Sequence, residues 1–176
     1  PRNIMCGFRA GGASVRLIDF GSARFTAEIG GETLHVGSRS LIPLTPNYAA
    51  PELTMAAMKA AAAAAAPADV ARPELGDDTV MLTFAADVYA FGLIAIQLLT
   101  GKNSFDVAEM VKQSNWAMLD DVPGELVHML VSAVSHKPSE RPSAKDLCSA
   151  FAGALKTHDS SSSSSDGVES VPGWAV

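Results

Sequence analysis

Residues 83–99 are apolar around nearly the whole circumference when the stretch is read as a helix. Its large apolar side chains do not keep to one face; they are Val88, Phe91, Leu93, Ile94, Ile96, Leu98 and Leu99. A helix with this pattern is expected to be buried on every side, so other elements must pack around it. Gly101 follows at the position where glycine commonly ends a helix. The sequence therefore predicts a fold built around one central helix.

Two further helices and a hairpin are expected beside it. Residues 126–134 carry apolar side chains at helical spacing. Residues 143–155 form a second amphipathic pattern, in which Ser143 and Asp146 have the spacing of a capping box. Two short runs of strand-forming residues, 4–6 and 15–18, are separated by glycines, which predicts a β-hairpin. We therefore expect an α+β chain that is mainly α.

Three segments do not fit into this core. Residues 22–45 show no regular period and contain many turn-forming residues, which predicts a long loop. Residues 53–66 favour a helix that ends at Pro67, but their alanine run lacks large side chains, so residues 55–80 are expected to form a low-complexity insertion. The serine-rich residues 156–176 are expected to be a disordered tail.

Charge and cysteine content narrow the function classes. The formal net charge is −6 and the pI is near 5.1, with no basic run. This argues against nucleic-acid binding and against a polybasic membrane patch. No apolar stretch is long enough to span a bilayer. Cys6 and Cys148 are the only cysteines and are far apart, so we expect reduced, buried thiols and a cytoplasmic or nuclear protein. Because the chain does not begin with Met, it does not show the N-terminus of its parent.

Four short motifs occur in a characteristic order and spacing. They are Asp19-Phe20-Gly21, Ala50-Pro51-Glu52, Asp87-Val88-Tyr89-Ala90-Phe91-Gly92 and Arg141-Pro142-Ser143. Together they resemble the second half of a eukaryotic-type protein kinase domain, of the Ser/Thr kinase kind. The resemblance covers residues 1–155 and implies a kinase-like large lobe with a short hairpin and no N-terminal lobe. Two departures are the 55–80 insertion and a short stretch between Gly101 and Pro123.

The resemblance assigns metal ligands near the start of the chain. Asp19 would coordinate Mg²⁺, and Asn3 would be the second metal ligand at the end of the catalytic loop. Phe20 would pack beneath Asp19, while Gly21 would let the backbone turn away. The catalytic aspartate would lie five residues before Asn3, ahead of residue 1. The implied cofactors of the parent protein are therefore ATP and Mg²⁺, of which this chain would hold only part.

The same resemblance implies a structural ion pair in the activation segment. Ala50, Pro51 and Glu52 would close that segment, and Glu52 would pair with Arg141. Thr45 matches the threonine that contacts the catalytic aspartate and lysine, although Leu44 stands where the family has glycine.

Other residues have less specific roles. Asp87 would accept hydrogen bonds from the catalytic loop, or would cap its helix. Ser38 and Ser40 are candidate phosphorylation sites in the segment.

Three functions remain open at this point. The first is part of a protein Ser/Thr kinase, with ATP and a protein substrate as partners, whose isolated 176 residues neither bind ATP tightly nor transfer phosphate. The second is a pseudokinase-like binding module. The third is a helical interaction domain with accidental motif matches, which predicts no Glu52–Arg141 contact and no hairpin that presents Asp19. The sequence does not indicate an oligomeric state.

Overall fold

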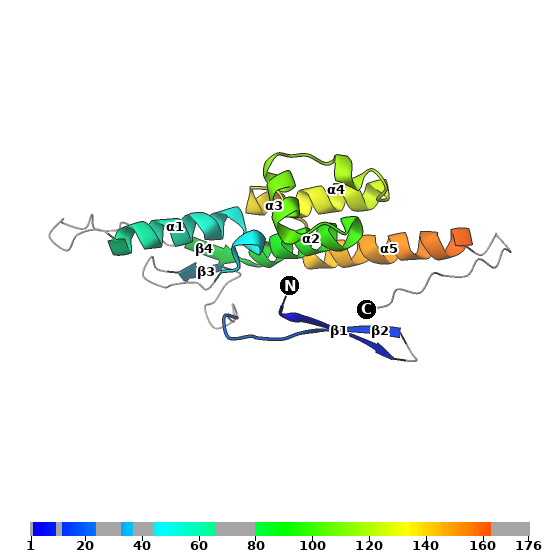
Figure 1. Cartoon of the computed structure of the whole chain (residues 1–176), viewed down its shortest axis with the longest axis horizontal. Coiled ribbons are helices and arrows are strands. Elements are labelled where there is room, and N and C mark those ends of the chain that lie inside the picture. Colours follow the sequence, from blue (N-terminus) through cyan, green and yellow to red (C-terminus); the bar gives the residue numbers. More distant parts are fainter. Residues whose placement is uncertain (1, 10–11, 24–32, 37–43, 66–79, 163–176) are drawn as a thin grey trace.

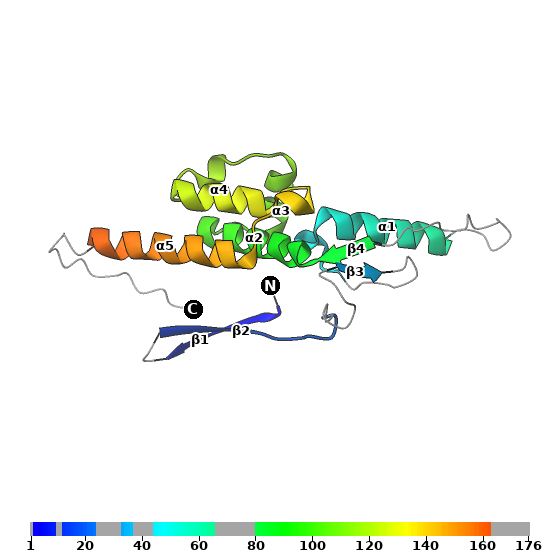
Figure 2. The same cartoon turned by 180° about the vertical axis from the view of Figure 1, so that it is seen from behind.

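The computed structural model describes residues 2–9, 12–23, 33–36, 44–65 and 80–162. These residues form two parts, which Figures 1 and 2 show from opposite sides. One part is a hairpin near the N-terminus. The other part, which we call the helical body, comprises residues 33–36, 44–65 and 80–162 and contains helices α1 to α5 and a second small sheet. The expected fold class, mainly α with a short hairpin, is confirmed.

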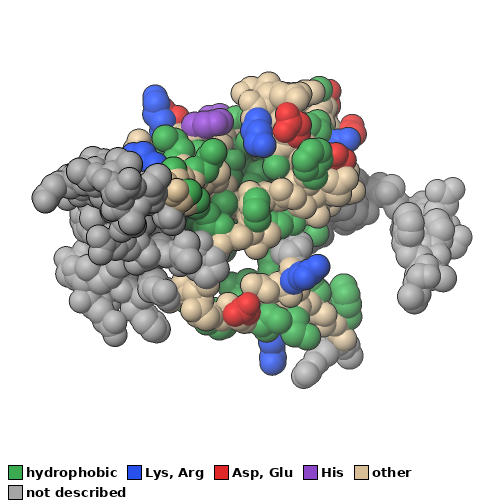
Figure 3. Space-filling view, turned by 60° about the vertical axis from the view of Figure 1, so that its left-hand side comes forward, with side chains coloured by type: hydrophobic (Ala, Val, Ile, Leu, Met, Phe, Trp, Pro, Cys, Tyr) green, Lys and Arg blue, Asp and Glu red, His purple; other side chains and the backbone are tan. Residues whose placement is uncertain are grey.

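The hairpin consists of β1 (Ile4–Arg9) and antiparallel β2 (Gly12–Leu17). Their register runs from Ile4 opposite Leu17 to Arg9 opposite Gly12. All of β2 is exposed, and none of the hairpin residues whose burial is described is buried. In Figure 3 the hairpin is the lower body, and it shows hydrophobic side chains at its surface. The hairpin therefore has backbone pairing but no hydrophobic core of its own.

Helix α2 (Phe84–Thr100) lies at the centre of the helical body. It begins after Thr83, whose hydroxyl accepts a hydrogen bond from the Ala85 N–H at 3.3 Å. It ends before Gly101, which has a φ of 66°. Both ends follow ordinary capping chemistry, because a threonine oxygen satisfies a free N–H and glycine adopts the left-handed conformation easily.

The core forms where α2 meets α3 (Ser104–Lys112) and α4 (Gly124–Ala133), and where α4 meets α5 (Ala144–Ser162). The short 3-10 turn η3 (Ala117–Leu119) lies between α3 and α4, and η4 (Pro138–Glu140) lies between α4 and α5. A third 3-10 turn, η2 (Pro46–Tyr48), precedes α1. The largest fully buried side chains are Ile96, Leu119, Leu130 and Val107. Burying each of them stabilises the body by about 1.5–3 kcal/mol.

The expectation that α2 is buried on every side is wrong. Phe84, Phe91 and Leu98 are 56%, 44% and 77% exposed, and they recur every seven residues along one face. The opposite face is buried against α3 and α4, whereas the stripe stays exposed even though the Phe91 ring meets the Phe151 ring of α5 edge-on, with centroids 5.8 Å apart. The apolar side chains on every face of α2 therefore did not mean that every face is buried.

The second sheet and helix α1 revise the predicted loop and insertion. Helix α1 (Pro51–Ala65) begins two residues before the expected start. Strand β3 (Thr33–Val36) lies inside the expected loop and pairs antiparallel with β4 (Val80–Thr83), at the end of the expected insertion. The partners are distant in sequence, so local periodicity could not reveal the pairing. The whole segment between α1 and β4, residues 66–79, lies outside the described residues.

Three smaller expectations also meet the structure here. Helix α5 continues to Ser162 instead of ending at Leu155, because no proline or glycine interrupts residues 154–162. Cys6 and Cys148 are free, as expected, but both are exposed and not buried. Among the described residues no single helix is long and apolar enough to cross a membrane. Helices α2 and α3 would be so only if taken together, and they are bent by 114° relative to each other.

Candidate functional site

Asn3 and Asp19 lie at the same end of the hairpin. Asn3 directly precedes β1, and Asp19 follows β2 by two residues. The Ile18 N–H donates a hydrogen bond to the Asn3 carbonyl oxygen at 3.0 Å, which continues the strand pairing by one step. Both residues are exposed. The hairpin register thus brings two oxygen-bearing side chains from distant positions in the chain to one edge.

Asp19 has an unusual backbone conformation. Its φ is 63°, in the left-handed region that non-glycine residues seldom adopt. The Gly21 N–H lies 3.4 Å from Asp19 Oδ1 and donates to it, which supports the turn. A residue held in this region typically costs about 1–3 kcal/mol and often marks a functional site. The conformation turns the chain away from β2 directly after the carboxylate.

The chemistry of these two side chains fits a magnesium ion. Mg²⁺ prefers oxygen ligands and is commonly held by one or two protein groups, with water and phosphate completing its shell. The Asn3 amide oxygen and the Asp19 carboxylate could supply two such ligands. Among the described residues no group of three or more His, Cys, Asp or Glu side chains could hold a metal by itself. Any metal here would therefore need oxygen ligands from elsewhere.

Phe20 does not show the packing expected for it. Its side chain is 67% exposed, so it does not fill a hydrophobic space beneath Asp19 among the described residues. Thr45 is exposed as well and directly precedes η2. Its carbonyl oxygen accepts a hydrogen bond from the Tyr48 N–H at 2.9 Å, but its hydroxyl does not cap the turn. The Thr45 hydroxyl therefore remains available for another contact.

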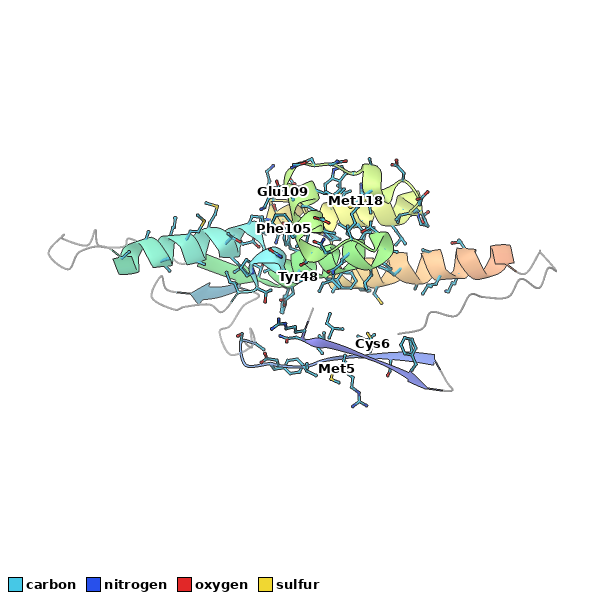
Figure 4. All side chains as sticks on the ribbon, in the orientation of Figure 1. Met5, Cys6, Tyr48, Phe105, Glu109 and Met118 are labelled. Atoms are coloured by element: carbon cyan, nitrogen blue, oxygen red, sulfur yellow. The ribbon has the colours of Figure 1, made fainter. Side chains whose placement is uncertain are left out.

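Two hydrogen bonds that the sequence did not predict fasten η2 to the helical body. The Tyr48 hydroxyl donates to Gln97 Oε1 at 2.8 Å, and Asn47 Nδ2 donates to Ser104 Oγ at 3.3 Å. Figure 4 shows Tyr48 at this edge of the body, whereas Met5 and Cys6 lie on the separate hairpin. One signal was present in the sequence, since Gln97 is a polar residue within the apolar run from Ala90 to Leu99 of helix α2.

Glu52 and Arg141 form a bidentate ion pair. Arg141 Nη1 donates to Glu52 Oε1 at 2.7 Å, and Nη2 donates to Oε2 at 2.8 Å. The Arg141 side chain is fully buried, and that of Glu52 is 20% exposed. Arg141 also donates to the carbonyl oxygens of Ala85 and Ser135, each at 2.9 Å. One guanidinium thus joins the start of α1, the start of α2 and the segment that leads into α5.

The ring of Tyr89 completes the surroundings of this guanidinium. The Arg141 Cζ atom lies 4.9 Å from the ring centroid, which is cation–π geometry. Burial raises the pKa of Tyr89; nearby Arg141 lowers it by a smaller amount, and Glu52 raises it. The aromatic contact was not predicted. A buried charge with this many partners fixes geometry, and removing one partner is costly because the other charge then remains buried.

Asp87 lies in the first turn of α2 but does not cap the helix, because Thr83 has that role. Desolvation by neighbouring atoms raises the pKa of its carboxyl group, although the residue as a whole is exposed. Within the described part of the chain, no group donates a hydrogen bond to the carboxylate. Its contribution to a catalytic loop therefore stays a prediction.

The structure brings only some of the candidate residues together. Glu52 meets Arg141, and Asn3 lies near Asp19, but no hydrogen bond or ion pair within the described ranges joins the hairpin to the helical body. Ala50 is fully buried, and it directly precedes α1, whose first two residues are Pro51 and Glu52. Ser38 and Ser40 lie outside the described residues. The accidental-match hypothesis predicted neither the ion pair nor the hairpin, and both are present.

Comparison with known proteins gives one consistent result. The sequence model of the family described as protein kinase domain matches residues 1–151. Two similar proteins are the EPD1-interacting receptor-like cytoplasmic serine/threonine-protein kinases 5D and 5A of Gossypium barbadense. Each is 33% identical over 104 residues, which is 59% of this chain and 17% of the relative.

A third relative comes from another plant. The serine/threonine-protein kinase PBL13 of Arabidopsis thaliana is 32% identical over 113 residues, or 61% of this chain and 17% of the relative. The match covers 17% of the length of each of these three relatives. No solved structure matches the chain.

Proposed function

The chain belongs to the protein kinase domain family, and from this premise we propose that it is part of a protein serine/threonine kinase. The parent protein would transfer the γ-phosphate of ATP to serine and threonine hydroxyls of protein substrates. The observation that carries this proposal is the hairpin end, where Asn3 and Asp19 offer two oxygen ligands beside a strained turn. The names of the similar proteins, which are serine/threonine kinases, support the substrate class.

The described residues would have different roles in the reaction. Phosphoryl transfer depends mainly on positioning and on offsetting negative charge, for which Mg²⁺ supplies positive charge at the phosphates. Asn3 and Asp19 would hold that ion, and the turn at Asp19 would fix the direction of the carboxylate. The Thr45 hydroxyl, unused by η2, would contact the catalytic groups of the complete site. Glu52 and Arg141 would keep the segment that follows Thr45 attached to the helical body.

We further propose that a polypeptide of these 176 residues neither binds ATP tightly nor transfers phosphate. The sequence contains no Gly-rich phosphate loop, no lysine strand and no H-R-D segment. Incubation of the purified chain with radiolabelled ATP, Mg²⁺ and casein should leave casein unlabelled. Labelling of casein that disappears in Asp19→Ala would show that this part of the proposal is wrong.

The metal ligands can be tested without catalysis. Mn²⁺ often replaces Mg²⁺ at oxygen sites, and it broadens NMR signals of nearby amides because it is paramagnetic. Titration of the 176-residue chain with Mn²⁺ should broaden the amides of Asn3 and Asp19 first. Asp19→Ala should remove this selectivity, whereas Asp106→Ala, which changes an exposed carboxylate on α3, should not. Broadening that ignores the hairpin would contradict the assignment of these ligands.

In the longer natural protein, the same ligands should control the rate. Asp19→Ala and Asn3→Ala should each lower phosphate transfer by about 10²–10³-fold, the usual effect of removing one group that stabilises transition-state charge. Asp106→Ala is again the matched control and should leave the rate unchanged. Equal measurable rates for all variants would contradict the ligand assignment, whereas no transfer by the unaltered protein would favour the second function, a binding module without catalysis.

That second function has one observation in its favour. The helical body has a core and its Glu52–Arg141 pair without any contribution from the metal ligands, so it could bind partners on its own. The coding sequence upstream of Pro1 separates the two functions, because an H-R-D segment there supports the enzyme and its absence supports the binding module.

The names of two relatives include the word cytoplasmic, so we propose a cytoplasmic or nuclear location for the parent protein. A fluorescently tagged full-length protein that localises to a secretory compartment would contradict this location.

A further inference from the structure

The β3–β4 ladder joins two segments that lie far apart in the sequence. Strand β3 lies between Gly21 and Thr45, in the segment that the proposed function identifies as the activation segment. Strand β4 lies between the alanine-rich helix α1 and the central helix α2. The ladder pairs Thr33 with Thr83 at one end and Val36 with Val80 at the other. A strand outside the activation segment therefore fixes the middle of that segment.

The two strands are anchored unequally. Strand β4 contacts both α1 and α2, and its last residue, Thr83, also caps α2. Strand β3 has β4 as its main partner among the described elements. In effect β4 is fixed to the helical body, and β3 is added to its edge. If the ladder opens, β3 is the strand that leaves.

The ladder is short enough to open reversibly. It has four residue pairs and only two strands, and two-stranded sheets are marginally stable by themselves. Opening it does not require loss of the Glu52–Arg141 pair or of the Tyr48–Gln97 hydrogen bond, since both lie outside it. Such locally unstable units are where proteins commonly place conformational switches.

While the ladder is closed, some backbone N–H and C=O groups of residues 33–36 are hydrogen-bonded to β4. Another protein that recognises an extended segment does so largely through the same N–H and C=O groups. Pairing with β4 and recognition by such a protein therefore exclude each other along this stretch. This competition makes the state of the ladder a condition for access to the segment.

We propose that the β3–β4 ladder is a regulatory clasp, in which β4 holds the middle of the activation segment and withholds it from proteins that bind extended chains. Only the name of the segment rests on the proposed kinase function. The clasp itself can be tested in the 176-residue chain without any kinase activity, so failure of one proposal is distinguishable from failure of the other.

Disulfide trapping tests the closed state. Adjacent pairs in an antiparallel ladder alternate between hydrogen-bonded and non-hydrogen-bonded geometry, so two double variants are made: Leu34→Cys with Leu82→Cys, and His35→Cys with Met81→Cys. Both are built in a Cys6→Ser, Cys148→Ser background, because the native thiols are free and exposed. At least one pair should oxidise to an intramolecular disulfide, and the single-cysteine variants should not. Failure of both pairs to oxidise would overturn the proposal.

Trypsin is the probe for access, since it binds its substrates as extended chains. It can cleave after Arg39, three residues beyond the end of β3. The oxidised variant should be cleaved there at least about fivefold more slowly than the reduced one, because cleavage follows the population of the open form. At least one of Leu34→Pro and His35→Pro should be cleaved faster than the native chain, because alternate N–H groups of a two-stranded antiparallel ladder face the partner strand and proline cannot donate to it.

Cleavage after Lys112 reports unfolding of the helical body, because this residue is the last of helix α3 and directly follows the buried Val111. It should stay slow in every variant, which separates opening of the clasp from loss of the fold. Equal rates after Arg39 in the oxidised, reduced and proline variants would overturn the proposal, as would a rise confined to variants that are also cleaved faster after Lys112.

Discussion

The hairpin and the helical body differ in what holds them together. The hairpin has six backbone-paired positions and no buried side chain among those whose burial is described, whereas the helical body buries Ile96, Leu119 and Leu130 almost completely. The proposed metal ligands lie on the first part, and the ion pair lies in the second. The chain thus combines a helical body that has a core with a hairpin edge that lacks one and carries the proposed metal ligands. The buried core and the proposed chemistry are located in different parts of this molecule.

The largest test of this contrast is the removal of Arg141. Arg141→Ala should lower the free energy of unfolding of the helical body by about 3–5 kcal/mol, because the Glu52 carboxylate would remain partly buried without its partner. Urea unfolding followed by circular dichroism measures this loss. Lys137→Ala removes the exposed pair with Glu140 and should cost far less, because exposed ion pairs contribute little to stability.

A double-mutant cycle shows whether the Arg141 effect belongs to the pair. Glu52→Gln and Arg141→Ala together should lower the free energy of unfolding by less than the sum of the two single changes. Once one partner is gone, removing the other no longer leaves a buried charge without its partner. Strict additivity would mean that the two side chains do not interact, and that the pair does not link distant parts of the helical body.

A matched pair of leucine truncations compares the two parts directly. Leu130→Ala empties a fully buried position and should cost about 2–5 kcal/mol. Leu17→Ala makes the same chemical change on the hairpin, where the side chain is 62% exposed, and should cost less than about 0.5 kcal/mol. Urea midpoints of the two variants check the difference. Similar costs would mean that the hairpin is packed in solution and that the contrast is wrong.

The smallest expected effect is on the pH dependence of stability, and it compares Asp87 in the helical body with Asp19 on the hairpin. Burial raises the pKa of Asp87 above its ordinary value of 3.8, so its protonated form is favoured by folding. Its contribution to stability is then fully present below pH 3.8 and is lost as the pH rises through the higher folded pKa. Asp87→Asn should therefore raise the stability at pH 7 slightly, and should remove this part of the pH dependence.

Comparison with the native chain isolates this effect, because Glu140 and Asp146 have lowered pKa values and act in the opposite direction in both proteins. Asp19→Asn, the same change on the hairpin, should leave the unfolding of the helical body unaffected. Urea midpoints between pH 3 and pH 8 provide the measurement. A loss of stability in Asp87→Asn at pH 7 would contradict the assigned cause.

Much of the helical body could be predicted because its signals are local. Thr83 and Gly101 bound α2, and Ser143 and Asp146 form the expected capping box, with the Asp146 N–H donating to Ser143 Oγ at 3.2 Å. The motif order also predicted that Glu52 would lie beside Arg141. Capping and helical period act over a few residues, so a sequence displays them directly.

The features that could not be predicted depend on distant partners. The pairing of β3 with β4, the Tyr48–Gln97 hydrogen bond and the exposed stripe on α2 are each decided by which segments meet. An apolar side chain such as Phe91 looks the same in the sequence whether or not another element covers it. For the site, the sequence placed Asn3 and Asp19 at one end of a hairpin but did not indicate the left-handed backbone of Asp19.

The Glu52–Arg141 pair also bears on how the chain could change over evolution. The two residues are 89 positions apart, so forming the pair closes a long loop that includes residues 66–79. The entropy of closing a loop grows only with the logarithm of its length, so deleting those residues would change the cost by about 0.15 kcal/mol. Insertions and deletions there are therefore nearly neutral for the scaffold, provided that β4 can still reach β3.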